Sequence, residues 1–303
     1  MSHIRGGTSR RNDLRPAIGG RKIIYLNTFH TFLVTFRVLA DTFHAQPWQQ
    51  RSERFALSAR GSGEIDMSTI AMPQTLSSKA EPVAPWFHTI ILAFIFLGLA
   101  AAGAIFQRRA SAHPLSTGSS HILLYLSVIA MEYGLFRYVS AGLARRGVTM
   151  KSLIGGSWNS LRDVLRDAGL ALGIWVIWSG VERLWGHIFD IGHAASIQTF
   201  LPGKPLEIAL WIVVSMSAGI SEEIAFRGYF QRQFGALTGS KWAAVCLQAV
   251  LFGVAHGYQG IQATARIALF GALFGVLAIW RGTLRPGIMA HAFGDILSGI
   301  FGI

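Results

Sequence analysis

Near-continuous apolar runs dominate the chain from residue 86 onward, and several are long enough to span a bilayer. A helix that crosses the hydrocarbon core needs about 20 predominantly apolar residues. The runs are separated by short polar or basic stretches and lie at 86–106, 121–143, 164–189, 206–230, 242–256, 261–280 and 286–303. They predict an all-α fold, a polytopic membrane helical bundle of about seven to eight transmembrane helices.

Composition and charge agree with a membrane protein. The chain is 51% hydrophobic and only 14% charged, which is unlike an ordinary soluble domain. Its net charge of +12 (27 basic against 15 acidic residues) could suggest nucleic-acid binding. The basic residues, however, lie mainly in the N-terminal tail and in loops between apolar runs, as the positive-inside rule predicts for cytoplasmic loops. We therefore expect an integral membrane protein with no nucleic-acid partner.

The loops at 145–166, 228–241 and 281–285 fall on one side when seven spans are counted, together with the N-terminal tail. That side is predicted to be the cytoplasm. Arg108 and Arg109 are exceptions on the opposite side. Cys246 is the only cysteine, so an intrachain disulfide and a cysteine-based metal cluster are both excluded.

Residues 1–85 differ in composition from the rest of the chain. They are rich in Arg, Ser and Gly and lack sustained periodicity. Two interpretations stay open: a mostly disordered segment, or a mis-annotated N-terminal extension with the true start at Met67 or Met72. The predicted membrane domain is 86–303 under either interpretation.

Adjacent carboxylates, Glu222 and Glu223, occur in the second half of the run at 206–230. A charge at membrane depth is costly, so it normally faces the protein interior and often marks a functional site. In an α-helix, Glu223 and Arg227 stand at i,i+4, the favourable order for an ion pair. Glu222 then lies about 140° round the helix from Arg227 and remains free for other chemistry.

Further polar residues lie in the downstream apolar runs. His256 ends one run, four residues after Phe252, and the last run carries His291 and Asp295, also four residues apart. Glu222 and these three polar residues could converge if their helices pack side by side. Glu132, in the run at 121–143, is interpreted as a structural polar contact, and the GxxxG spacing of Gly271 and Gly275 indicates tight helix packing.

The three motifs in order, Glu222-Glu223-xxx-Arg227, Phe252-xxx-His256 and His291-xxx-Asp295, resemble those of the CPBP intramembrane proteases. That family includes CAAX prenyl endopeptidases of the Ras-converting type and the bacteriocin-processing Abi group. The resemblance covers roughly 120–303, with the motif core at 206–303.

The resemblance implies an intramembrane endopeptidase that hydrolyses peptide bonds near the bilayer. Its substrate would be a peptide or a membrane protein, including a prenylated CAAX-type protein. The protein would be located in the inner membrane of a bacterium. By position, Glu222 and His256 would activate the attacking water, and His291 with residue 295 would stabilise the oxyanion. Glu223 and Arg227 would support the site as an ion pair.

Elementary chemistry agrees with these roles. Water is a poor nucleophile, so peptide hydrolysis needs a base within hydrogen-bond reach of it. Donors aimed at the developing oxyanion commonly contribute several kcal/mol. A histidine can serve as such a donor, with its proton position set by its neighbours.

Asp295 departs from the family pattern, which usually has Asn at this position. An ionised Asp only accepts hydrogen bonds and cannot stabilise an oxyanion. Three explanations stay open: Asp295 is protonated, it orients His291, or its role differs.

The cofactor question also has two answers. Metal-independent chemistry is favoured, and HExxH, the usual zinc signature, is absent from the sequence. The alternative is Zn²⁺ held by Glu222, His256, His291 and Asp295, because imidazole and carboxylate are suitable zinc ligands.

Two other functions would be compatible with the pattern. One is a non-catalytic membrane protein of the same fold, acting as an immunity or partner-binding factor. The other is a proton- or ion-coupled transporter, which ranks last because the sequence shows no clear inverted repeat.

Overall fold

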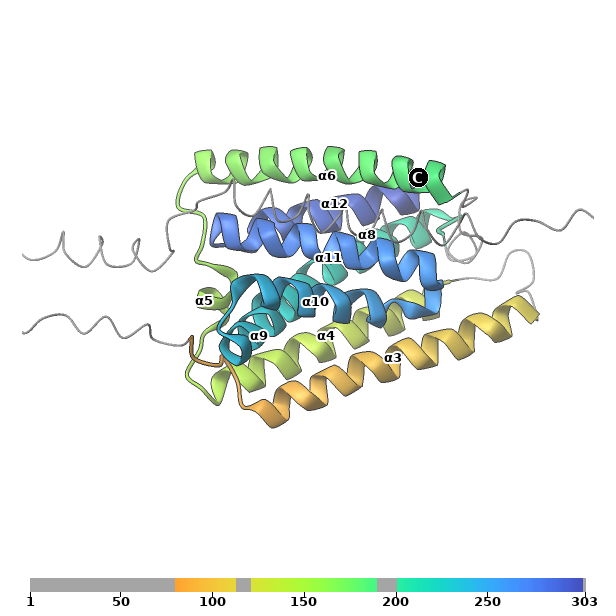
Figure 1. The fold of residues 1–303 in the computed structure, drawn as a ribbon. Coiled ribbons are helices and arrows are strands. Elements are labelled where there is room, and N and C mark those ends of the chain that lie inside the picture. Colours follow the sequence, from red (N-terminus) through yellow and green to blue (C-terminus); the bar gives the residue numbers. More distant parts are fainter. Residues whose placement is uncertain (1–79, 113–120, 190–200, 302–303) are drawn as a thin grey trace, which may run out of the picture. The chain divides into compact units, whose positions relative to one another are not determined.

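The computed structural model describes residues 80–112, 121–189 and 201–301, all within one compact unit, 68–303. The described residues contain helices, turns and loops and no strand, which confirms the predicted all-α fold (Figure 1). Most of the N-terminal segment predicted to be disordered or mis-annotated, with both alternative start residues, lies outside the described residues.

Each predicted apolar run forms a helix, and short helices fill some of the connections. The elements are α3 (Trp86–Ala112), α4 (Ile122–Ala144), α5 (Met150–Ile154), α6 (Leu161–Phe189), α8 (Pro205–Glu222), η2 (Glu223–Phe230), α9 (Gln231–Thr238), α10 (Lys241–Ala255), η3 (Gly257–Gln259), α11 (Ile261–Arg281) and α12 (Arg285–Phe301).

Five of these helical segments are long and apolar enough to cross a membrane: α3, α4, α6, α11 and the continuous stretch of α8, η2 and α9. The two remaining runs form shorter helices, α10 with 15 residues and α12 with 17 residues. At 1.5 Å per residue, α10 is only about 22 Å long, less than the hydrocarbon core of about 30 Å. The polytopic bundle is confirmed, with α10 and α12 shorter than full spans.

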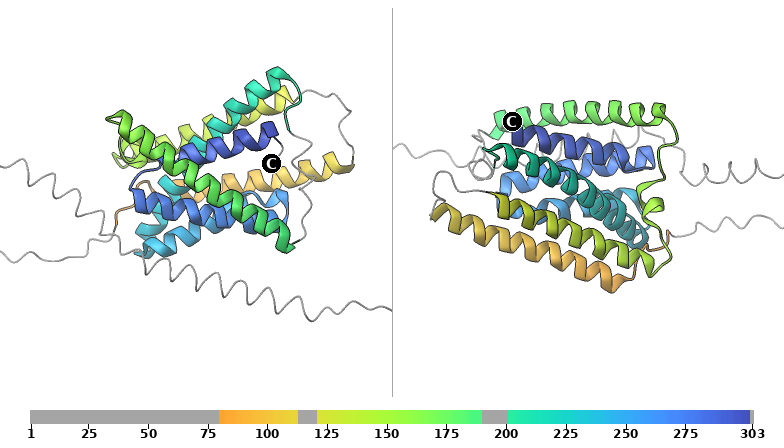
Figure 2. Two further views of the ribbon diagram at one scale, coloured as in Figure 1. Left: turned by 90° about the horizontal axis from the view of Figure 1, so that it is seen from above. Right: turned by 180° about the vertical axis from the view of Figure 1, so that it is seen from behind.

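Helix α8 packs between α4 and α12, α12 also contacts α6, and α10 runs along α11 (Figures 1 and 2). Glycines allow these helices to approach closely. A Cβ on Gly219 of α8 would lie 2.7 Å from the backbone N of Ala292 in α12. A Cβ on Gly271 of α11 would lie 3.0 Å from Cα of Ala249 in α10, so the predicted tight packing of α11 is present.

The motif stretch that the sequence analysis treated as a regular α-helix is partly a π-helix. Element η2, Glu223–Phe230, buries all eight of its residues and contacts α4, α5, α10 and α11 as well as its neighbours in sequence. A π-helix has i→i+5 hydrogen bonds, is rare, and is frequently found at functional sites. The assumed turn of 100° per residue is therefore wrong over η2. The wider π-helical turn occurs where neighbouring helices pack against η2 on several sides.

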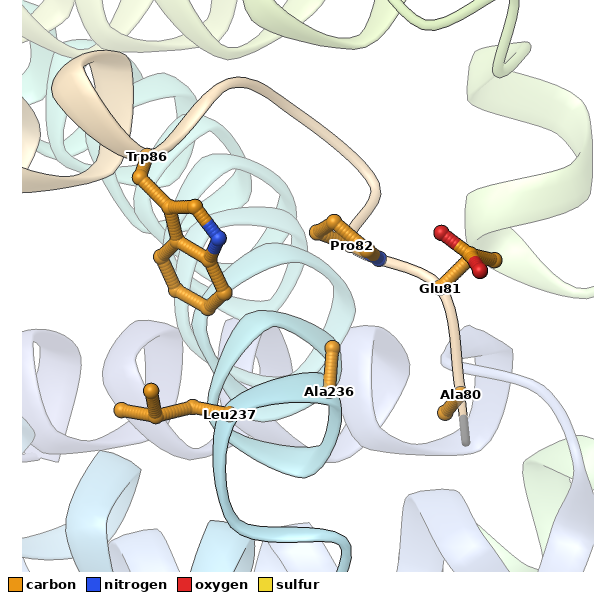
Figure 3. Close-up of a pocket in the computed structure, with 6 residues that line it drawn as sticks. All are labelled: Ala80, Glu81, Pro82, Trp86, Ala236 and Leu237. Carbon is orange, nitrogen blue, oxygen red and sulfur yellow. The ribbon is translucent and has the colours of Figure 1, made fainter. Parts of the chain in front are cut away.

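The residues before α3 pack against α9. The backbone N–H of Ala84 donates to Gln233 Oε1 at 3.3 Å, and Gln233 Nε2 donates to the carbonyl of Ala84 at 3.0 Å. Beside this contact lies a cavity of about 250 Å³ lined by Ala80, Glu81, Pro82, Trp86, Ala236 and Leu237 (Figure 3). None of the predicted site residues lines it, so this cavity is separate from the candidate site.

We predict that Gly219→Ala destabilises the protein, because its methyl group would collide with the backbone of α12. Overpacking of this kind typically lowers the free energy of unfolding by about 1–3 kcal/mol. The measurement is thermal unfolding of the detergent-purified protein. Gly180→Ala in α6 is the matched control, since nothing lies within 4 Å of its Cβ position. Equal melting temperatures for the two variants would contradict the close approach of α8 and α12.

Candidate functional site

The four predicted polar residues come together at the meeting point of three helices. Glu222 is the last residue of α8, His256 follows the end of α10, and His291 and Asp295 lie one turn apart on α12. Glu222 Oε2 lies 3.9 Å from His256 Nε2 and 3.8 Å from His291 Nε2. His291 Nε2 lies 3.6 Å from Asp295 Oδ2. The site therefore has two imidazole nitrogens facing one carboxylate oxygen.

The four side chains differ in their exposure. The exposed fraction of the side chain is 42% for Asp295, 19% for His256, 15% for Glu222 and 8% for His291. Glu222 Oε2 is buried and has no hydrogen-bond partner among the described residues. Buried polar atoms are nearly always paired, so an unpaired one in a native structure calls for an explanation. Glu222 Oε2 can therefore accept a hydrogen bond from a reacting molecule.

Local partners orient both imidazole rings. His256 Nδ1 lies 2.9 Å from the carbonyl oxygen of Phe252, four residues earlier, at the end of α10. His291 Nδ1 lies 3.1 Å from Glu223 Oε1. A carbonyl and an ionised carboxylate only accept hydrogen bonds, so we assign the Nδ1 proton to each ring. The Nε2 atoms are then the ones available to the site, where they accept when the ring is neutral and donate when it is protonated.

Glu223 supports the site through one oxygen atom. Its Oε1 lies 3.1 Å from Arg227 Nη1 and 3.1 Å from His291 Nδ1, and the Glu223 and Arg227 side chains are almost completely buried. Gly287 leaves room for this carboxylate, since a Cβ there would lie 3.2 Å from Glu223 Oε2. One carboxylate thus both balances a buried cation and holds a histidine ring.

Three aromatic rings surround the Arg227 guanidinium. Its Cζ lies 4.2 Å from the ring centre of Phe252, 5.7 Å from that of Phe270 and 5.6 Å from that of Phe274. Such cation–π contacts are worth more where the cation is desolvated. Phe270 and Phe274 were not predicted to contact Arg227, because nothing in the sequence distinguishes them from the other apolar residues of α11. Only the packing of the helices reveals these contacts.

Glu132, which the sequence predicted to make a structural polar contact, makes one beside the site. It is 4% exposed and accepts a hydrogen bond from the hydroxyl of Ser221, the residue before Glu222. The sequence did contain a signal, because an acidic residue within an apolar run is by default a candidate functional residue.

The chemistry of the donor set is compatible with a metal ion. Imidazole and carboxylate are suitable ligands for zinc. Each histidine donates its Nδ1–H to a carbonyl or carboxylate oxygen, as metal-binding histidines donate the N–H of the ring nitrogen that does not bind the metal. In the described parts of the chain, however, no group of three or more His, Cys, Asp and Glu side chains is arranged to hold a metal ion.

We predict that Arg227→Met strongly destabilises the protein. The variant would leave Glu223 buried without its cation, and breaking a buried pair in this way costs about 3–5 kcal/mol in the free energy of unfolding. Chemical unfolding in detergent measures the loss. The double variant Glu223→Gln/Arg227→Met should recover part of it, because it contains no buried glutamate that lacks its arginine. Arg109→Met on the exposed surface of α3 is the control. A stable Arg227→Met variant would show that the ion pair is not essential to folding.

Comparison with known proteins adds one positive finding. No curated protein and no solved structure matches the chain. A family model described as type II CAAX prenyl endopeptidase Rce1-like matches residues 204–297, a segment that contains all three motifs. At the level of the family, this match supports a protease, and with the five candidate spans it supports an integral membrane protein. Residues 204–297 thus match the Rce1-like family, which confirms over this segment the resemblance to CPBP intramembrane proteases.

Proposed function

We propose that the protein is an intramembrane endopeptidase in which Glu222, assisted by His256, activates a water molecule to hydrolyse a peptide bond. The observation that carries this proposal is the position of Glu222 Oε2, 3.9 Å from His256 Nε2 and 3.8 Å from His291 Nε2. A molecule placed among these three atoms would meet a carboxylate base and two imidazoles. The Rce1-like family match supports the same reaction class.

In the proposed reaction, Glu222 removes a proton from water while the water oxygen bonds to the peptide carbonyl carbon. His256, with its Nδ1–H held by the Phe252 carbonyl, keeps Nε2 turned toward the water. Protonated His291 donates from Nε2 to the oxyanion, and Glu223 stabilises that imidazolium through Nδ1. The C–N bond then breaks, and Glu222 returns its proton to the leaving amine. Every proton in this scheme moves between water, Glu222 and the product.

Asp295 fits this scheme as a second partner of His291. Its Oδ2 lies 3.6 Å from His291 Nε2, whereas Glu223 already holds the ring through Nδ1. We therefore propose that Asp295 favours the protonated ring and is not itself the oxyanion donor. An Asn at this position would instead donate directly to the oxyanion.

We predict that Asp295→Asn, which restores the residue usual in the family, keeps the rate constant kcat within about threefold of wild type, while Asp295→Leu lowers it about tenfold or more. The assay is cleavage of a farnesylated CAAX-type peptide by the purified protein. Both variants should fold normally, because the Asp295 side chain is 42% exposed. Inactive Asp295→Asn would mean that the carboxylate itself is required.

As substrate we propose a peptide segment presented at the membrane, with prenylated CAAX-type and bacteriocin-type peptides as the two classes to compare. The match to a family of type II CAAX prenyl endopeptidases supports the first class. A second candidate function, a non-catalytic immunity or partner-binding protein of the same fold, is favoured by one observation, the Asp at position 295. Loss of biological function in Glu222→Gln would separate the enzyme from this alternative.

We further propose the inner membrane of a bacterium as the location, with the N-terminus in the cytoplasm. Contacts around α5 support a shared side for the basic loops. Arg232 Nη2 donates to the carbonyl of Leu153 at 3.0 Å, and the backbone N–H of Leu284 donates to the carbonyl of Ile154 at 2.8 Å. The loops before α6 and α12 and the stretch of α9 therefore meet at one end of the helices.

We predict that Glu222→Gln lowers kcat on the same peptide by about 100-fold or more, since general-base catalysis contributes roughly 10²–10⁴-fold. The amide has nearly the same shape, so the melting temperature should not change. Glu182→Gln is the control, because Glu182 is another carboxylate within a membrane helix, 3.7 Å from Arg266. Full turnover by Glu222→Gln would overturn the proposal.

The same assay decides the role of metal. The metal-independent scheme predicts equal cleavage with and without chelator, and no stoichiometric metal in the purified protein by mass spectrometry. Activity lost to chelator and restored by zinc would instead assign His256, His291 and a carboxylate as ligands.

A further inference from the structure

We infer that Glu132 of α4 is a positioning residue that holds the end of α8 from which Glu222 is presented. This inference rests on the proposed function. It concerns a helix outside the segment 204–297 that the family model covers. It also replaces the interpretation of Glu132 as a purely structural contact.

Glu132 is a buried carboxyl group. The side chain is 4% exposed and lies within a predominantly apolar helix, which is long and apolar enough to cross a membrane. A carboxyl group in such a place requires a partner, and residues of this kind usually mark functional positions in membrane helices. Helix α4 packs directly against α8 and η2, so the partner comes from the motif segment.

The partner of Glu132 is Ser221. Ser221 Oγ lies between two acceptors, Glu132 Oε2 on α4 and the carbonyl oxygen of Ser217 on its own helix, the latter at 2.7 Å. A hydroxyl has one hydrogen and accepts as well as donates. Ser221 can therefore bond to Glu132 whether that carboxyl group is ionised or protonated, and the link between α4 and α8 persists in both states.

Ser221 lies at the junction of α8 and η2. It immediately precedes Glu222, the last residue of α8, and η2 begins at Glu223. The helix changes from i→i+4 to i→i+5 hydrogen bonding at this junction. A contact from α4 at this point restrains the turn that carries both glutamates, where a displacement of about 1 Å can cost roughly 100-fold in rate.

Glu132 also interacts electrostatically with the charged groups of the site, namely Glu222 on α8 and His291 and Asp295 on α12. Glu132 therefore adds α4 to the helices that build the site.

The test compares Glu132→Leu with Glu132→Gln in the full-length protein. The glutamine amide can still bond to Ser221, and leucine cannot. We expect Glu132→Leu to lower kcat for the farnesylated peptide about tenfold or more with little change in KM, and Glu132→Gln to stay within about threefold of wild type. Ser221→Ala should resemble Glu132→Leu, and the double variant Ser221→Ala/Glu132→Leu should show no further loss because both changes remove one contact.

Ser127→Ala is the matched control, since this hydroxyl also lies on α4 but bonds only to the carbonyl of Leu124 in its own helix, at 2.7 Å. Melting temperatures separate a positioning role from a structural one. Normal kcat in Glu132→Leu would overturn the inference, whether or not the variant melts early. Equal losses in Glu132→Gln and Glu132→Leu would also overturn it, because rescue by the amide is its main prediction.

A second readout works without peptide cleavage. A hydrophobic carbodiimide modifies carboxyl groups in membrane proteins, and mass spectrometry reports its rate of reaction at Glu222. We expect the reaction rate at Glu222 to differ from that of wild type by more in Glu132→Leu than in the Ser127→Ala control. An unchanged rate would overturn the inference. An altered rate in a protein that cleaves no peptide would support the positioning role while the proposed endopeptidase function fails.

Discussion

The buried carboxylate of Glu223 is the interaction on which the site depends. One of its oxygens lies 3.1 Å from both the Arg227 guanidinium and the His291 ring. Arg227 could not be buried without this carboxylate, because an unpaired charge in the interior is strongly destabilising. His291 would not have a defined orientation without it. The same atom therefore links η2 to α12 and joins the stability of the helices to the geometry of the site.

Close helix packing brings the other residues within range. Gly219 allows α8 to approach α12 at Ala292, and the short helix α10 ends at His256, which places this ring beside Glu222. Small residues commonly serve this purpose in membrane helices, where packing between helices rather than water exclusion drives association. The site is thus a consequence of helix ends and close contacts, and no loop among the described residues carries Glu222, His291 or Asp295.

The sequence was a good guide where a local rule applied. Apolar runs predicted the helices, the GxxxG spacing predicted the contact of Gly271, and i,i+4 spacing predicted the approach of Glu223 to Arg227. It was a poor guide to the π-helix η2, whose eight residues are buried on several sides, since that geometry accompanies contacts with other helices. It also left the partner of Glu132 undetermined, because nothing in the run at 121–143 indicates which helix this carboxyl group meets.

By itself, the sequence determined the all-helical membrane fold and the set of polar residues placed in apolar helices, because bilayer thickness and the cost of buried charge act on each segment separately. Only the tertiary structure decided which nitrogen of each histidine faces Glu222, that Glu223 is shared by two partners, and that α4 reaches the site through Ser221. Those features arise from atoms on different helices, and their separations depend on how the helices pack, which spacing along one chain segment does not specify.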